Sequence, residues 1–104
     1  MSPMQDPETV IARFYVKEGK EEEFEKVHTQ SWQAYLRLGI IHEKPHIVLR
    51  GKDSAGKTYF VEILTWKDRS ITEHPPEEVR ALWTQLNAAC ERIEFPEVQI
   101  VHNH

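Results

Sequence analysis

The sequence has only one cysteine, Cys90, among its 104 residues. A single cysteine excludes an intrachain disulfide and agrees with a reducing compartment, so we expect a cytoplasmic protein. Long apolar runs are also missing, since no stretch approaches the roughly 18 residues that a membrane-spanning helix needs. The N-terminal residues lack the basic and then apolar pattern of a signal peptide. We therefore expect no membrane association.

Positive charge is scarce as well. The chain has 13 Lys and Arg against 17 Asp and Glu, a formal net charge of -4, and the two signs are interspersed. A protein that binds DNA or RNA needs a basic stripe to neutralise phosphates, so we expect no nucleic-acid partner. The chain also lacks a glycine-rich phosphate loop and a Gly-x-Ser-x-Gly nucleophile turn.

What is present is an apolar pattern whose period changes along the chain. Alternation of apolar residues predicts four strands, at residues 9–16, 46–50, 57–66 and 98–102. Apolar residues three or four positions apart predict two helices, at residues 21–38 and from Pro76 to about Ile93, and Cys90 lies on the buried stripe of the second. Gly39 predicts the end of the first helix, and Pro76 suits the first position of the second.

The predicted order β-α-β-β-α-β contains a polar hairpin turn at residues 51–56. With right-handed crossovers, this order gives an α+β, ferredoxin-like fold: a four-stranded antiparallel sheet with two helices on one face. Residues 1–8 are expected to be a flexible lead-in and residues 9–104 a single domain. Both faces of the strands carry large apolar groups, but two helices can cover only one face. We therefore expect a homodimer in which two sheets close into an α+β barrel.

Two segments carry a resemblance to a known family. Residues 12–24 (ARFYVKEGKEEEF) resemble the first strand and acidic helix start of antibiotic biosynthesis monooxygenase-like (ABM) domains, of the dimeric α+β barrel superfamily. Residues 59–68 (YFVEILTWKD), with His74 and then residues 79–86, resemble their third strand and second helix. The resemblance implies a dimeric barrel whose members include cofactor-independent quinone-forming monooxygenases, haem-degrading enzymes and proteins of no known activity.

The haem-degrading branch is disfavoured. The resemblance would require an asparagine on the first strand and a histidine two to three turns into the second helix. Neither the strand at 9–16 nor the region 82–86 contains the required residue. Acidic residues of the superfamily often lie two positions before the strand tryptophan, where this chain has Leu64 and carries its carboxylate at Glu62 instead.

Two residues are candidate catalytic groups. His74 precedes Pro75-Pro76, and an imidazole with an ordinary pKa near 6.5 can take a proton from a phenol at neutral pH. The alternative is that His74 only forms hydrogen bonds in its loop. Glu62 interrupts an apolar strand, so it is an acid or base in a dry cavity, one half of an ion pair with Arg13 or Arg50, or a group at a wet barrel rim.

Aromatic residues are candidates for binding a planar ligand. Trp66, Trp32, Tyr59 and Tyr35 would shape a pocket by stacking, although filling the core is the alternative for each. Trp83 lies in the middle of an apolar stripe and is interpreted as core. Arg13 would orient an anionic ligand or form a strand salt bridge. His28 lies on the core-facing stripe of the first helix, as a binding residue or as a hydrogen-bonded core histidine.

Metal binding and thiol chemistry are not expected. The pairs His42-x-x-x-His46 and His102-x-His104 lie in a loop and at the chain end, whereas catalytic zinc needs about three rigidly held ligands. We expect adventitious metal capture at most. Cys90 has no basic activator nearby in sequence, which argues against a nucleophile.

The sequence supports two hypotheses. In the first, the chain is a monooxygenase-like homodimer that binds a small aromatic or quinol-like molecule and oxidises it without a cofactor. His74 would be the base, Trp66 with Tyr59 or Tyr35 would shape the pocket, and Glu62 or Arg13 would orient the ligand. In the second, the chain is a non-catalytic small-molecule-binding or structural dimer of the same fold. An open apolar pocket favours the first, and a cavity filled by tryptophans favours the second.

Overall fold

The computed structural model describes residues 6–99 and 101–102. No helix in this part of the chain is long and apolar enough to cross a bilayer. The elements follow the order β1 (Glu8–Val16), α1 (Glu21–Leu38), β2 (Ile47–Lys52), β3 (Thr58–Trp66), α2 (Ser70–Glu73), α3 (Glu77–Ala88) and β4 (Cys90–Glu94).

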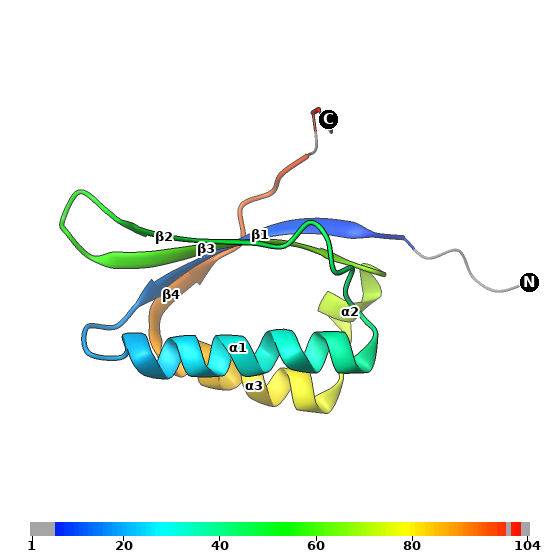
Figure 1. Cartoon of the computed structure of the whole chain (residues 1–104), viewed down its shortest axis with the longest axis horizontal. Helices are drawn as coiled ribbons and strands as arrows, with labels where there is room; N and C mark the ends of the chain where they lie inside the picture. The colour runs from blue at the N-terminus through cyan, green and yellow to red at the C-terminus, as the bar shows by residue number, and fades with distance from the viewer. Residues whose placement is uncertain (1–5, 100, 103–104) are drawn as a thin grey trace, which may run out of the picture.

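The four strands form one antiparallel sheet in the order β2-β3-β1-β4. Helices α1 and α3 pack side by side on one face of this sheet, and the opposite face carries no helix (Figure 1). This is the ferredoxin-like α+β arrangement, so the predicted fold class is confirmed.

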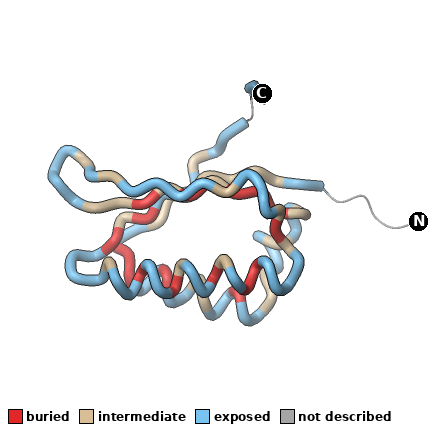
Figure 2. Tube along the Cα trace, in the orientation of Figure 1, coloured by how far each residue is buried: buried red, intermediate tan, exposed pale blue. Residues whose placement is uncertain are grey.

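Buried residues lie where the sheet faces the helices (Figure 2). One core cluster, at the β4 end, is built on Phe14, Phe24, Phe60 and Leu86. A second cluster contains Tyr35, Ile41, Leu64, Trp66 and Val79. The inward residues of β3 are those that the period-two pattern assigned to one face, Phe60, Glu62, Leu64 and Trp66.

Helix α1 begins and ends as the sequence predicts. Its first turn carries Glu21, Glu22 and Glu23, whose negative charges complement the partial positive charge at a helix N-terminus. Gly39 takes the left-handed conformation, with φ of 68°, and donates its N–H to the carbonyl of Leu36. The second long helix, α3, begins one residue later than expected, because Pro76 is its N-cap.

The predicted C-terminal part of the fold is wrong. Helix α3 ends at Ala88, and the fourth strand is Cys90–Glu94 rather than residues 98–102. No residue from 95 to 99, nor 101 or 102, is in a strand, and Ile100 lies outside the described residues.

A β-bulge explains the error. The register shifts between Tyr15 and Val16, so that Phe14 pairs with Ile93 while Val16 pairs with Cys90. Cys90 is buried and Ile93 packs on the first core cluster, although they are three residues apart on a strand. The extra residue in β4 therefore places Cys90 and Ile93 on one face at a three-residue spacing, which is also typical of a helix face.

The outer face of the sheet is partly apolar. Ile11, Val61 and Ile63 are half-buried there, and their cross-strand neighbours Ile47 and Leu49 are 44% and 54% exposed. This face is the one for which the sequence predicts a second copy of the chain. That homodimer stays a prediction.

We expect the purified chain to have the mass of a dimer in solution at micromolar concentration. Replacing Ile47 and Leu49 together with lysine should convert it to a monomer, because two charges in an apolar interface cannot be solvated. The control is Leu36→Lys, an exposed position on α1. Light scattering coupled to size-exclusion chromatography measures both. A monomeric wild type would contradict the prediction.

Candidate functional site

A carboxylate lies in the middle of the core. Glu62 is at the centre of β3, with its side chain toward the helices and only 4% of the residue exposed. On the sheet its neighbours are Ala12 on β1 and Val48 on β2, neither of which offers a polar side chain. Removing an ionised carboxylate from water costs several kcal/mol unless it is paired and hydrogen-bonded. The partners of Glu62 must therefore come from outside the sheet.

Two histidines supply this pairing. The Nε2 atom of His28, from the middle of α1, lies 3.0 Å from Oε2 of Glu62. The Nε2 atom of His46, the residue just before β2, lies 2.8 Å from the same oxygen. Their side chains are 13% and 19% exposed, so both rings are close to the surface but not open to bulk solvent. We call Glu62, His28 and His46 the His–Glu–His cluster.

The cluster holds Glu62 in its ionised form. Burial by itself raises the pKa of the Glu62 carboxyl, but the hydrogen bonds from His28 and His46, together with their charge interactions, outweigh it. The pKa of Glu62 is therefore lowered from its ordinary value. Because each Nε2–H is donated to the carboxylate, the lone pair of a neutral ring lies on its Nδ1 atom. Each imidazole can thus accept a proton while Glu62 stabilises the cation that forms.

Aromatic rings surround the cluster. The indole of Trp32 stacks on the imidazole of His46, with centroids 3.5 Å apart and planes 4° from parallel. On the other side, Phe24 stacks on His28 and Phe14 meets it edge-on. These contacts hold His28 between two phenylalanine rings and cover one face of His46.

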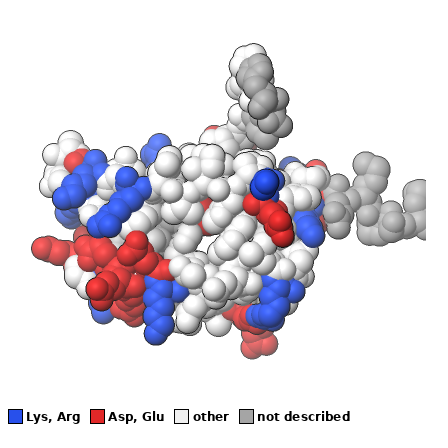
Figure 3. Space-filling model, in the orientation of Figure 1, with Lys and Arg blue, Asp and Glu red and all other residues white. Residues whose placement is uncertain are grey.

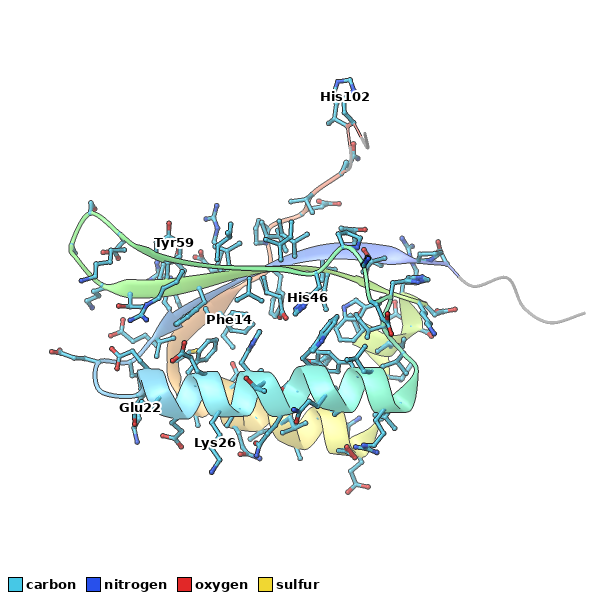
Figure 4. All side chains as sticks on the ribbon, viewed as in Figure 1. Phe14, Glu22, Lys26, His46, Tyr59 and His102 are labelled. Atoms are coloured by element: carbon cyan, nitrogen blue, oxygen red, sulfur yellow. The ribbon has the colours of Figure 1, made fainter. Side chains whose placement is uncertain are left out.

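A cavity of about 300 Å³ opens beside the cluster. In Figure 4, His46 lies between the sheet and α1, and Figure 3 shows a hollow at the same level that few charged side chains border. Its walls come from α1 and from strands β2 and β3, with lining residues Phe24, Glu25, His28, Thr29, Trp32, His46, Val48 and Phe60. This volume is at the lower end of the range for ligand pockets, about 300–1,000 Å³, and fits a compact aromatic molecule.

A second hollow, of about 450 Å³, lies between α1 and α3. An exposed ion pair between Arg37 and Glu78 borders it, and glutamines form much of its remaining surface. It has no buried titratable group in its walls. The smaller cavity is therefore the better candidate for chemistry.

The structure brings three of the predicted site residues together. Glu62 accepts the hydrogen bond of His28, and Trp32 lies one turn further along α1 in the wall of the same cavity. Glu62 was expected to pair with Arg13 or Arg50 if it was structural. Its partners are histidines instead, while Arg13 lies 3.9 Å from Glu94.

Tyr35 and Trp66 lie in the second core cluster. Trp83 packs against both clusters, as interpreted from its apolar stripe, and its Nε1 donates a hydrogen bond of 2.6 Å to the Tyr35 hydroxyl. Burial raises the pKa of Tyr35 well above its ordinary value, so this phenol stays protonated. The tryptophans at this end fill the core, and the open cavity lies toward the other end of α1.

The remaining predicted residues lie elsewhere. Tyr59 and Arg13 are on the outer face of the sheet, where Tyr59 stacks with Tyr15. His74 is exposed at the end of α2, where its backbone N–H bonds to Ser70, and does not line the cavity. The roles predicted for these three residues stay predictions.

From the sequence, His46 was a candidate only as a metal ligand beside His42. The side of the sheet on which His46 lies could nevertheless have been predicted, because His46 and Val48 are two residues apart and therefore face the same side of a strand. The hairpin register pairs Val48 with Glu62, which brings His46 close to the carboxylate.

The expected lack of thiol and metal chemistry can be compared with the described residues. Cys90 is buried in β4 rather than on a helix, and burial raises the pKa of its thiol to about 11. Within residues 6–99 and 101–102, no group of three or more His, Cys, Asp or Glu side chains is arranged to hold a metal ion. In the His–Glu–His cluster, both nitrogens approach one oxygen as hydrogen-bond donors. His104 lies outside the described residues.

Comparison with known proteins extends the fold assignment. No family model and no curated protein matches the chain in sequence. Among solved structures, a variant of SnoaB, a cofactor-independent oxygenase from Streptomyces nogalater, aligns over 94% of this chain and 96% of its own. The TM-score is 0.72 and the identity 22%.

Two further solved structures share the fold. An antibiotic biosynthesis monooxygenase aligns with a TM-score of 0.64 and 16% identity over 88% of this chain and 97% of its own. The protein PA3566 from Pseudomonas aeruginosa aligns with a TM-score of 0.69 and 15% identity over 97% of this chain and 100% of its own. Structural neighbours of the chain are thus ABM-like proteins, as the resemblance implied, and at these identities the likeness establishes the fold.

The pairing of Glu62 predicts how stability depends on pH. A lowered folded-state pKa means that Glu62 contributes stability that is complete above its ordinary value of 4.5 and is lost as the pH falls through the folded value. We expect Glu62→Gln to lower the free energy of unfolding by about 1–3 kcal/mol at pH 7, since hydrogen bonds to a charged group are lost. Urea unfolding at pH 7 and at steps below pH 4.5 measures the difference, which should shrink with acid. A difference that grew below pH 4.5 would refute this assignment. Glu73→Gln, at an exposed position on α2, is the control.

Proposed function

We propose that the chain is a small-molecule oxygenase that binds a phenolic or quinol-like aromatic compound in the 300 Å³ cavity and oxidises it with O2 and no cofactor. The observation that carries the proposal is the His–Glu–His cluster in the wall of an aromatic-lined cavity. The fold supports it, because a structural neighbour is a cofactor-independent oxygenase.

The first step assigned to the cluster is proton removal. A buried carboxylate that fixes an imidazole and stabilises its cation is the arrangement by which enzymes strengthen a histidine base. An ordinary phenol has a pKa near 10 and an ordinary histidine near 6.5, so the transfer is uphill by about 3.5 units, or about 5 kcal/mol. Two imidazoles beside one carboxylate reduce this free-energy cost. One imidazolium can balance the negative charge of Glu62, and the other can balance that of the phenolate. More acidic phenols and enols are therefore the favoured substrates.

The following steps use the electrons of the substrate. For a phenolic compound with an activated CH2 group, such as an anthrone, the deprotonated substrate gives one electron to O2. The resulting carbon radical and superoxide combine in a C–O bond, and the peroxide takes back the proton from the imidazole. Loss of water, which removes the second hydrogen of the carbon, leaves a carbonyl. In total CH2 and O2 become C=O and H2O, with four electrons passing from substrate to oxygen.

A non-catalytic binding protein is the second candidate. It is favoured by the complete pairing of the cluster, since in the described residues no buried side-chain nitrogen or oxygen lacks a hydrogen-bond partner. A fully paired cluster is also what a purely structural role requires. The two candidates predict the same binding and different turnover.

Oxygen uptake with a panel of anthrones and hydroquinones tests the proposal. We expect turnover by the wild type and a loss of about 10²–10⁴-fold in the His28→Gln, His46→Gln double variant, which is the range for removing a general base. The single variants should lose less if either imidazole can act. His42→Gln, in the loop before β2 but outside the cavity lining, is the matched histidine control.

His74→Ala separates the structure-based assignment from the sequence-based one. Activity should persist in this variant if the base lies in the cluster, and should disappear if His74 is the base. Circular dichroism checks that each variant is folded. Binding of the panel with no oxygen uptake by the wild type would favour the non-catalytic candidate, and equal turnover by the folded double variant would overturn the assigned base.

A further inference from the structure

An arginine next to two of the cavity's lining residues has no ion pair within the described part of the chain. Arg50 lies on β2 two residues after Val48, and pairs with Phe60 on β3 in the antiparallel register. Its guanidinium carbon is 5.8 Å from the centre of the Phe60 ring. Val48 and Phe60 both line the cavity, so the guanidinium of Arg50 lies next to residues of the cavity wall.

The other arginines of the sheet and the loops around it are engaged differently. Arg13 and Arg92 both approach Glu94, and Arg69 pairs with Asp6. In the described part of the chain, Arg50 has no carboxylate within 4 Å, and its guanidinium makes a cation–π contact with the Phe60 ring. A guanidinium held over an aromatic face keeps its five N–H donors available for an incoming anion.

We propose that Arg50 forms an anion-binding subsite and that the ligand of the cavity is an aromatic anion, such as a hydroxylated aromatic carboxylate. Its ring would lie against Phe60 and Trp32, and its carboxylate would take two parallel hydrogen bonds from Arg50. The phenolic end then lies toward His28 and His46. This inference rests on the proposed function only in placing the ring inside the cavity.

The opposite wall carries the opposite charge. Glu25 lines the cavity from α1, and its side chain is exposed. In Figure 3, acidic side chains gather at the start of α1, and basic ones lie above them toward the β2–β3 hairpin. An anion is therefore attracted by the β2 side of the rim and repelled by the α1 side. This asymmetry favours one orientation of the ligand. The charges of Arg50 and Glu25 can be removed separately, so each one tests the sign of the ligand's charge.

A matched pair of probes measures the preference. 6-Hydroxy-2-naphthoate and its carboxamide have the same rings and carry the phenol at the end opposite the acid group, but only the first is an anion at neutral pH. Calorimetric titration of the wild type should show about tenfold tighter binding of the carboxylate, the scale of a charge-assisted interaction near the surface. The preference should shrink as salt is raised to 0.5 M, because mobile ions screen exposed charges.

Four variants locate the charge. Arg50→Gln should remove the tenfold preference and leave carboxamide affinity within about twofold, and Arg50→Lys should restore part of the preference, since it keeps the charge without the planar fork. Glu25→Gln should strengthen carboxylate binding by a few fold. Lys52→Gln removes the same charge further along β2 and should change little.

The outcomes separate this inference from the proposed function. Carboxylate binding that depends on Arg50 without oxygen uptake would keep the subsite and overturn the oxygenase. Turnover of uncharged phenols that Arg50→Gln does not affect, with equal affinity for both probes, would overturn the subsite and keep the oxygenase. Tighter binding of the carboxamide, or a gain of affinity in Arg50→Gln, would assign the opposite sign to the rim.

Discussion

One ionised carboxylate in the core, that of Glu62, determines how the two layers of this molecule meet. The sheet cannot satisfy it, because its neighbours on β1 and β2 are Ala12 and Val48. Its hydrogen-bond partners are His28 from α1 and His46 from the segment before β2. Three parts of the chain that are distant in sequence therefore meet at a single oxygen atom. Losing the hydrogen bonds to this charged group costs about 1–3 kcal/mol, a large share of the stability of a small domain.

The same requirement explains why a cavity lies where it does. The two apolar core clusters fill the layers on either side of Glu62 with aromatic and aliphatic side chains. Between them the cavity opens beside the two imidazoles, and Trp32 covers only one face of His46. A close-packed interior is the rule in proteins, so the opening next to paired polar groups is a distinct feature of this fold. The chemistry available to the chain is concentrated there.

Much of the fold could be predicted from the sequence, because local signals and tertiary packing agree. The α1 helix has its acidic first turn and its Gly39 stop, and β3 alternates between buried and half-buried residues from Tyr59 to Leu64. The last strand could not be read in this way. Its bulge opposite Tyr15 and Val16 places Cys90 and Ile93 on one face at helical spacing, and periodicity alone does not distinguish the two.

The candidate site was predictable only in part. Glu62 stood out as a carboxylate in an apolar strand, and His28 as a titratable residue on a buried stripe. Their meeting depends on how α1 crosses the sheet, which no local pattern encodes. His46 could have been added from the hairpin register, whereas Arg13 and Tyr59 lie on the outer face of the sheet and their predicted roles stay predictions.

The His–Glu–His cluster also has a consequence for how this sequence can diverge. Loss of one member leaves a buried charge or an unpaired donor, but replacement of all three by apolar residues of similar volume can be neutral or stabilising. Substitutions are therefore expected to occur together at positions 28, 46 and 62. A relative with an aliphatic residue at position 62 is expected to lack both histidines, and it would keep the fold while losing the proton-accepting groups.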